Sequence, residues 1–111
     1  MSKGIINNLG LDVICVPKFL YTNAKYKNLS GDAKVVYSVM LGLLDKSDAM
    51  GWIDKDGCKY VQMTARNIKD MLDCSDAHVT TIYKSLEKAG LIIRIRKPCE
   101  IARIYICNIF R

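Results

Sequence analysis

The chain has 111 residues, half of them apolar and a quarter charged, with a net charge of +6 at pH 7. This length forms one domain around one hydrophobic core, and the composition is that of a globular protein. No apolar run approaches the ~20 residues that span a bilayer, and the first residues lack the pattern of a secretory signal. We therefore expect a cytoplasmic protein that does not cross a membrane.

The five cysteines stand at scattered positions without a CxxC pair, and His78 is the single histidine. A structural zinc site needs about four such ligands, usually in close pairs. We expect free thiols in a reducing compartment, and neither a metal nor another cofactor.

The positive charge is gathered at the two ends of the chain. Residues 1–30 carry four lysines and one aspartate, whereas residues 91–111 carry five basic side chains and one acidic one. Residues 75–90 have no net charge. Basic regions of this kind favour binding to a polyanion through release of its counterions.

Residues 1–16 are apolar and irregular, and Pro17 prevents a helix from continuing through them. They predict an N-terminal apolar arm that packs on the core or on a partner subunit. Residues 17–111 form the domain. Its first predicted helix covers residues 31–44, with Ser30 as N-cap and a one-sided apolar set of Ala33, Val36, Tyr37, Met40, Leu41 and Leu44.

The middle of the chain predicts turns and a hairpin. Residues 45–51 are polar and turn-rich, and residues 52–54 and 59–62 flank Asp56-Gly57, a strong hairpin signal. The spacing of Asp54, Asp56 and Gly57 also resembles the start of a calcium loop. The later ligands of such a loop are missing, so the turn is favoured.

Two short helices follow in close succession. Thr64 can cap one whose inner face carries Ala65, Ile68, Met71 and Leu72, and Asp73-Cys74 ends it. Ser75 can cap the next, which covers residues 75–89 and ends at Gly90. Its predicted inward residues are Val79, Ile82, Tyr83, Leu86 and Ala89.

After Gly90 the apolar period changes to two, with Leu91, Ile93 and Ile95 alternating with Ile92, Arg94 and Arg96. Residues 97–100 form a basic tip that contains a proline, and residues 101–109 resume the rhythm of a strand. The whole order predicts an α+β fold, a winged helix-turn-helix with a three-helix core and a small wing hairpin.

The second helix of a helix-turn-helix enters the major groove, where each base pair displays a distinct pattern of donors and acceptors. The outward face of helix 75–89 offers short polar groups and one long cation, which suit base edges and phosphates. We expect duplex DNA to contact Ser75, Ala77, His78, Thr80, Thr81 and Lys84. The alternative is a polar face that is merely solvated.

The wing supplies most of the predicted attraction for DNA. We expect its cations to contact the DNA backbone or minor groove: Arg94, Arg96, Lys97 and Arg103. A solubilising strand edge is the alternative interpretation. Winged helices also serve as protein-interaction modules, and the apolar arm favours that hypothesis. No phosphate loop or nucleophile motif is present, and no motif places a titrating partner beside His78, so we do not expect an enzyme.

Several stretches resemble one family. The most specific is Val16-Pro17-Lys18-Phe19-Leu20-Tyr21-Thr22-Asn23 with the following Lys25-Tyr26-Lys27-Asn28-Leu29-Ser30-Gly31-Asp32-Ala33-Lys34-Val35-Val36-Tyr37. Gly51-Trp52-Ile53-Asp54-Lys55-Asp56-Gly57 and Leu86-Glu87-Lys88-Ala89-Gly90-Leu91-Ile92 agree with it. Together they resemble the replication initiator protein A family (RepA N-terminal type) of plasmids in low-GC Gram-positive bacteria.

This resemblance implies a winged-helix initiator domain that binds origin repeats (iterons), commonly as a homodimer, and that connects to host replication proteins through further segments. It places the reading helix on residues 75–89. The segment before Trp52 is shorter than in the family, and the chain ends at Arg111 where family members continue. A fragment of an initiator and a stand-alone transcriptional or copy-number regulator are both compatible with these departures.

Overall fold

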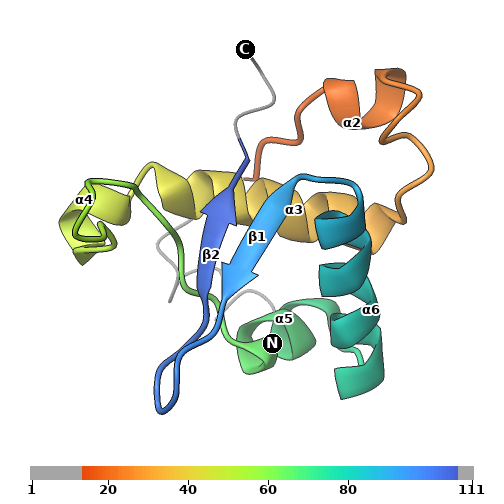
Figure 1. Cartoon of the computed structure of the whole chain (residues 1–111). Helices are drawn as coiled ribbons and strands as arrows, with labels where there is room; N and C mark the ends of the chain where they lie inside the picture. Colours follow the sequence, from red (N-terminus) through yellow and green to blue (C-terminus); the bar gives the residue numbers. More distant parts are fainter. Residues whose placement is uncertain (1–13, 108–111) are drawn as a thin grey trace.

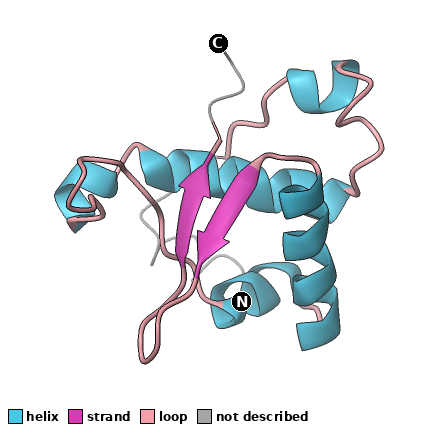
Figure 2. Cartoon of the chain, in the orientation of Figure 1, coloured by secondary structure: helices cyan, strands magenta, loops and turns pink. Residues whose placement is uncertain are grey.

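The computed structural model describes residues 14–107. A long helix passes behind a two-stranded hairpin, with one helix beside the hairpin and a short one at the opposite side (Figures 1 and 2). The elements are α2 (Phe19–Thr22), α3 (Gly31–Leu44), α4 (Ser47–Met50), α5 (Ala65–Leu72), α6 (Asp76–Lys88), β1 (Ile92–Ile95) and β2 (Arg103–Ile106). The predicted α+β winged helix-turn-helix is therefore confirmed, with α3, α5 and α6 as its three helices.

The central helix α3 begins and ends where the sequence predicts. The hydroxyl of Ser30 accepts a hydrogen bond from the Ala33 N–H at 3.1 Å, which satisfies one of the free donors of the first turn. The predicted set is buried except for Leu41 and Leu44, which are only partly buried. Val39 and Leu43 are buried as well, because α3 packs against both α6 and β2 and so buries more than one stripe.

Helix α5 starts with a capping box. The Thr64 hydroxyl accepts from the Asn67 N–H at 3.1 Å, and the Asn67 side chain accepts from the Thr64 N–H at 2.9 Å. Ile68 is buried, as predicted. The prediction that Ala65 faces inward is wrong: this residue is exposed, because the first turn of α5 lies at the rim of the core.

Helix α6 follows after a tight turn in which Asp73 adopts a left-handed conformation, φ 54°. Ser75 is the N-cap, as predicted, and its hydroxyl accepts from the His78 N–H at 3.2 Å. Four of the predicted inward residues are buried and Ala89 is partly buried. The helix stops at Gly90, whose φ of 77° suits a residue without a Cβ.

The segment between α3 and α5 differs from its prediction in two ways. The predicted turn before Gly51 contains a one-turn helix, α4. The predicted hairpin around Gly57 is reduced to one isolated bridge between Ile53 and Lys59. Its turn is present and closes tightly, because the Asp54 carboxylate accepts the N–H groups of Asp56 and Cys58, each at 2.9 Å. These hydrogen bonds lower the pKa of Asp54, and the one from the Cys58 N–H has the largest effect.

Helix α2 is not predicted by the sequence patterns, since four residues are too few to show a helical period. Its Phe19 ring packs edge-on against the rings of Tyr26 and Tyr37, with centroids 5.6 and 6.4 Å apart. Most of the predicted apolar arm, residues 1–13, lies outside the described residues. Ile14, near its end, packs against the core.

The wing hairpin pairs β1 with β2 in antiparallel register, from Ile92 opposite Ile106 to Ile95 opposite Arg103. The predicted second strand of residues 101–109 is shorter, and its last two positions lie outside the described residues. A bridge between Val61 and Ile104 joins the hairpin to the segment before α5.

The predicted alternation along β1 is present, but hydrophobicity alone does not indicate its inner face. Ile92 is buried and Arg94 is partly buried, whereas Ile93 and Ile95 are exposed. The inner face of the wing therefore carries a charged residue.

None of the helices within residues 14–107 is long and apolar enough to cross a membrane. The five cysteines are free thiols, as expected.

The stop of α6 yields a stability prediction. Gly90→Ala should lower the free energy of unfolding by about 1 kcal/mol, because a Cβ is disfavoured at positive φ. Crowding is not the cause, since the nearest atom to such a Cβ, Lys25 Nζ, lies 4.0 Å away. Urea denaturation measures the change. Gly31→Ala is the control: its Cβ would meet nothing within 4 Å, so it should be neutral or stabilising.

A second prediction concerns the hydroxyl of Tyr83, which donates to the Met63 carbonyl at 3.0 Å in the buried interior. Tyr83→Phe should destabilise the chain by about 1–2 kcal/mol, because it leaves this carbonyl without its partner. Tyr21→Phe, at a ring that is 58% exposed, should change the same urea midpoint very little. Equal effects of the two substitutions would contradict the prediction.

Candidate nucleic-acid interface

The outward face of α6 carries four of the predicted DNA-contacting residues. Ala77, Thr80, Thr81 and Lys84 are all exposed. The hydroxyls of Thr80 and Thr81 donate to the carbonyls four residues earlier, each at 3.1 Å. This fixes their rotamers and leaves the oxygen lone pairs and the methyl groups free. Lys84 makes no ion pair within the described residues, so its ammonium is available.

The other two predicted residues of α6 are already engaged at its N-terminus. The Ser75 hydroxyl is the helix cap, and His78 Nε2 lies 2.8 Å from Asp32 Oδ2 at the start of α3. The His78 and Asp32 side chains are 39% and 49% exposed. This contact ties the first turn of the reading helix to the first turn of α3, an orienting role that sequence spacing did not predict.

The wing cations divide into two groups. Arg96 and Lys97 are exposed and make no ion pair within residues 14–107. Arg94 faces α6, where its guanidinium lies 2.9 Å from Glu87 Oε1 and 4.2 Å above the Tyr83 ring. Two of the four predicted cations therefore remain free for a polyanion, and the other two have partners inside the protein.

Arg103 is the second engaged cation. Its guanidinium lies 4.7 Å above the Tyr60 ring and 4.0 Å from Glu100, and its side chain is 22% exposed. The Nε atoms of Arg103 and Arg94 are buried without a hydrogen-bond partner in the structure. The two side chains lie on opposite faces of the hairpin: Arg94 faces α6, whereas Arg103, opposite the exposed Ile95, contacts Tyr60 in the segment before α5.

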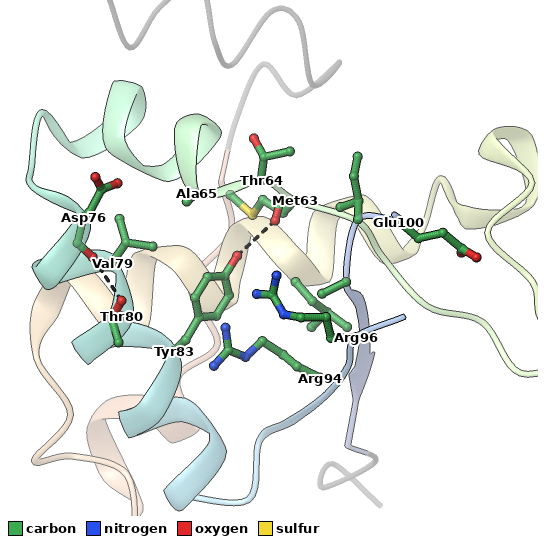
Figure 3. A pocket seen from close by; sticks show the side chains of 13 residues that line it. Met63, Thr64, Ala65, Asp76, Val79, Thr80, Tyr83, Arg94, Arg96 and Glu100 are labelled. Atoms are coloured by element: carbon green, nitrogen blue, oxygen red, sulfur yellow. Dashed lines mark hydrogen bonds between the residues drawn. The ribbon is translucent and has the colours of Figure 1, made fainter. Parts of the chain in front are cut away.

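A groove of about 320 Å³ separates the wing from α5 and α6 (Figure 3). The close-up shows Arg94 and Arg96 on the wing side and Tyr83 and Thr80 on α6. Burial raises the pKa of the Tyr83 hydroxyl to about 12. The phenol is therefore neutral at physiological pH, and its O–H donates a hydrogen bond to the Met63 carbonyl. The groove joins the reading face of α6 to the free cation Arg96.

Sequence reasoning missed the residues that orient this surface. The pairing of Asp32 with His78 is not predicted, Glu87 and Lys25 receive no role from the sequence patterns, and Tyr83 is predicted only as a core residue. Lys25 Nζ lies 4.0 Å from the Cβ position of Gly90, beside the end of α6. The partners of these residues lie far away in sequence or on another element, and no motif links them. The seven-residue separation of Glu87 and Arg94 is the one signal within short range.

The described surface combines short polar groups and the cation of Lys84 on α6 with a separate pair of free cations on the wing, Arg96 and Lys97. Short hydroxyl and methyl groups on α6 can contact base edges in a major groove. Arg96 and Lys97 can contact phosphates on the neighbouring backbone. These groups are ones that suit contact with base edges and phosphates.

Comparison with known proteins agrees with this geometry. The chain is 36% identical over 76 residues to a 41 kDa protein of Lactobacillus helveticus. The matched segment covers 68% of this chain and 22% of that protein. The chain therefore spans about a fifth of the length of this relative.

Three solved structures have similar folds. The N-terminal domain of a DNA-binding protein and a Rep–DNA complex each give a TM-score of 0.74 at 29% identity, covering 92% of this chain and 79% of theirs. The structure of an "MDR initiator" gives a TM-score of 0.72 at 31% identity, covering 92% of this chain and 81% of that chain.

The family model for the N-terminus of replication initiator protein A (RepA) matches residues 13–111, nearly the whole chain. The match includes α3, the helix-turn-helix and the wing, which are the elements that build the surface described above. The chain belongs to the replication initiator protein A family and corresponds to its N-terminal part.

Proposed function

We propose that this chain binds specific duplex DNA sites in plasmid replication initiation, with α6 in the major groove. One observation carries the proposal: α6 exposes Thr80, Thr81 and Lys84, and the wing next to it exposes Arg96 and Lys97, which make no ion pair among residues 14–107. A fold neighbour at 29% identity is a Rep–DNA complex, which supports a duplex as the ligand. Membership in the initiator family supports the setting in replication.

In the proposed complex the two elements have different tasks. The helix discriminates bases, because residues 75–90 carry no net charge and attract DNA little by themselves. The wing contacts the backbone or the adjacent minor groove through Arg96 and Lys97 and provides sequence-independent attraction. Lys25, beside the end of α6, is available to add to this attraction.

The wider role is also part of the proposal. The chain acts in the cytoplasm on origin repeats as a homodimer, and it acts by binding rather than by cleaving DNA. Host replication proteins are proposed as further partners, in keeping with membership in the initiator family. Sedimentation with and without a two-repeat duplex tests the dimer, and incubation of supercoiled plasmid with Mg²⁺ tests for nicking.

Thr81→Ala should reduce discrimination between sites. Duplexes selected by this protein from a random library provide the specific ligand, and scrambled duplexes provide the reference. Removal of a base contact should cost about 1–3 kcal/mol, or about 5- to 150-fold, on the specific duplex alone. Fluorescence anisotropy measures both affinities. A loss that is equal on specific and scrambled duplexes would show that Thr81 does not read bases.

Arg96→Ala should weaken both duplexes to the same extent. It should also reduce the slope of log affinity against log salt by about one unit, as expected for one lost phosphate contact. Lys46→Ala is the control, because Lys46 immediately precedes α4, on the side of the molecule away from α6 (Figure 1). It should leave the slope unchanged. Absence of duplex binding by the unmodified chain at low salt would contradict the proposed function and favour a protein-interaction module.

A further inference from the structure

The inner face of the wing carries a charged contact with the reading helix that the proposed function does not use. Arg94 is the inward residue of β1, one pleat beyond the buried Ile92. Its side chain lies beside Tyr83 of α6 (Figure 3), whereas Ile93 and Ile95 of the same strand are exposed. Arg94, which the sequence predicts as a DNA contact, therefore contacts α6 of its own chain instead.

Three residues make up this contact, which we call the wing latch: Tyr83, Glu87 and Arg94. The guanidinium of Arg94 lies 2.9 Å from Glu87 Oε1 and 4.2 Å from the centre of the Tyr83 ring. The Arg94 and Glu87 side chains are 23% and 34% exposed, so water screens the pair only in part. A guanidinium held by a carboxylate on one edge and an aromatic face below it has little freedom to rotate.

The Tyr83 ring of the wing latch is held in place by a hydrogen bond of its own. The Tyr83 hydroxyl donates to the Met63 carbonyl at 3.0 Å, so the ring beneath Arg94 is anchored to the segment that leads into α5. Among the described residues, the Glu87–Arg94 pair is the single ion pair between α6 and the wing. It spans Gly90, where the chain turns from helix to strand. The pair adds a side-chain contact to the backbone hydrogen bond from the Leu91 N–H to the Leu86 carbonyl, at 3.1 Å, which also joins the two elements.

We propose that Glu87 is a positioning residue for duplex binding: through Arg94 it sets the spacing between α6 and the wing that places Arg96 on the backbone while α6 occupies the major groove. This inference rests on the proposed function and adds to it an acidic residue that touches no DNA. The binding energy of the wing is realised only when both elements reach the duplex together.

The sign of one substitution separates this role from simple electrostatics. Glu87→Gln removes a negative charge close to a polyanion, and electrostatics alone therefore predicts tighter binding. The latch predicts weaker binding, because a neutral amide holds the Arg94 guanidinium less firmly than a carboxylate and so fixes the wing less well. We expect a loss of about three- to tenfold on the selected duplex, in keeping with the coupling of residues in direct contact.

Arg94→Lys tests the same geometry at constant charge. A lysine keeps the cation but has neither the planar fork nor the stacking surface of arginine. It should weaken duplex binding as Glu87→Gln does. Glu100→Gln is the matched control: it removes one negative charge from the wing itself, outside the latch, and should leave affinity unchanged or raise it.

The experiment measures duplex affinity by anisotropy for these three variants and for Glu87→Gln combined with Arg96→Ala, with amide hydrogen exchange of residues 92–106 alongside. The latch predicts that the two losses are less than additive, because Glu87 acts through the wing that Arg96 needs. It also predicts faster exchange in the hairpin of Glu87→Gln while the thermal midpoint of the whole chain changes little.

Tighter binding by Glu87→Gln, additive losses, or unchanged exchange in the hairpin would each overturn the proposal. Equal weakening by Glu100→Gln would also overturn it, since that would indicate a general effect of charge. Failure of the unmodified chain to bind any duplex is a distinct result, which removes the proposed function together with this role. Normal binding by the unmodified chain with an unaffected Glu87→Gln removes this role alone.

Discussion

The burial of Tyr83 is the constraint on which the functional surface depends. Its ring lies in the core, 6% exposed, its hydroxyl donates to the Met63 carbonyl, and its outer face supports the Arg94 guanidinium. One side chain therefore connects α6, the segment before α5 and the wing. A buried hydroxyl without its partner costs free energy, so this hydrogen bond restricts how α6 can rotate about its axis. That rotation decides which residues of α6 face outward.

The cations of the wing show that charge in a sequence and charge on a surface are different quantities. The residues after Gly90 carry a net charge of +4. The charge of Arg94 is paired with Glu87 and lies over a tyrosine ring, and the charge of Arg103 lies near Glu100 and over another tyrosine ring. Free positive charge on the described wing is concentrated at Arg96 and Lys97. A concentrated pair of cations gives a backbone contact a definite position, whereas a uniformly basic hairpin would attract DNA in many registers.

Much of the local structure could be predicted from short-range physics. Ser30, Thr64 and Ser75 cap helices as their hydroxyls predict, and Gly90 ends α6 because it accepts a positive φ. The weak predictions concern elements too short to show a period, such as α2 and α4, and the inner face of β1. A period of two identifies alternation but not which set faces inward. That choice depends on what lies beneath the strand, and here it is a glutamate and a tyrosine on α6.

The sequence by itself determined the order of helix, turn, capped helix and hairpin, the limits of the reading helix and the family of the chain, because caps, periods and local motifs act over a few residues. The tertiary structure decided which polar residues are free. His78 contacts Asp32, which is 46 residues away in the sequence, and Arg94 contacts Glu87. Such pairings depend on distances between elements, which arise only once the core has packed. The physical reason is that a polar or charged side chain pairs with a group that packing brings close in space, and sequence separation does not give that distance.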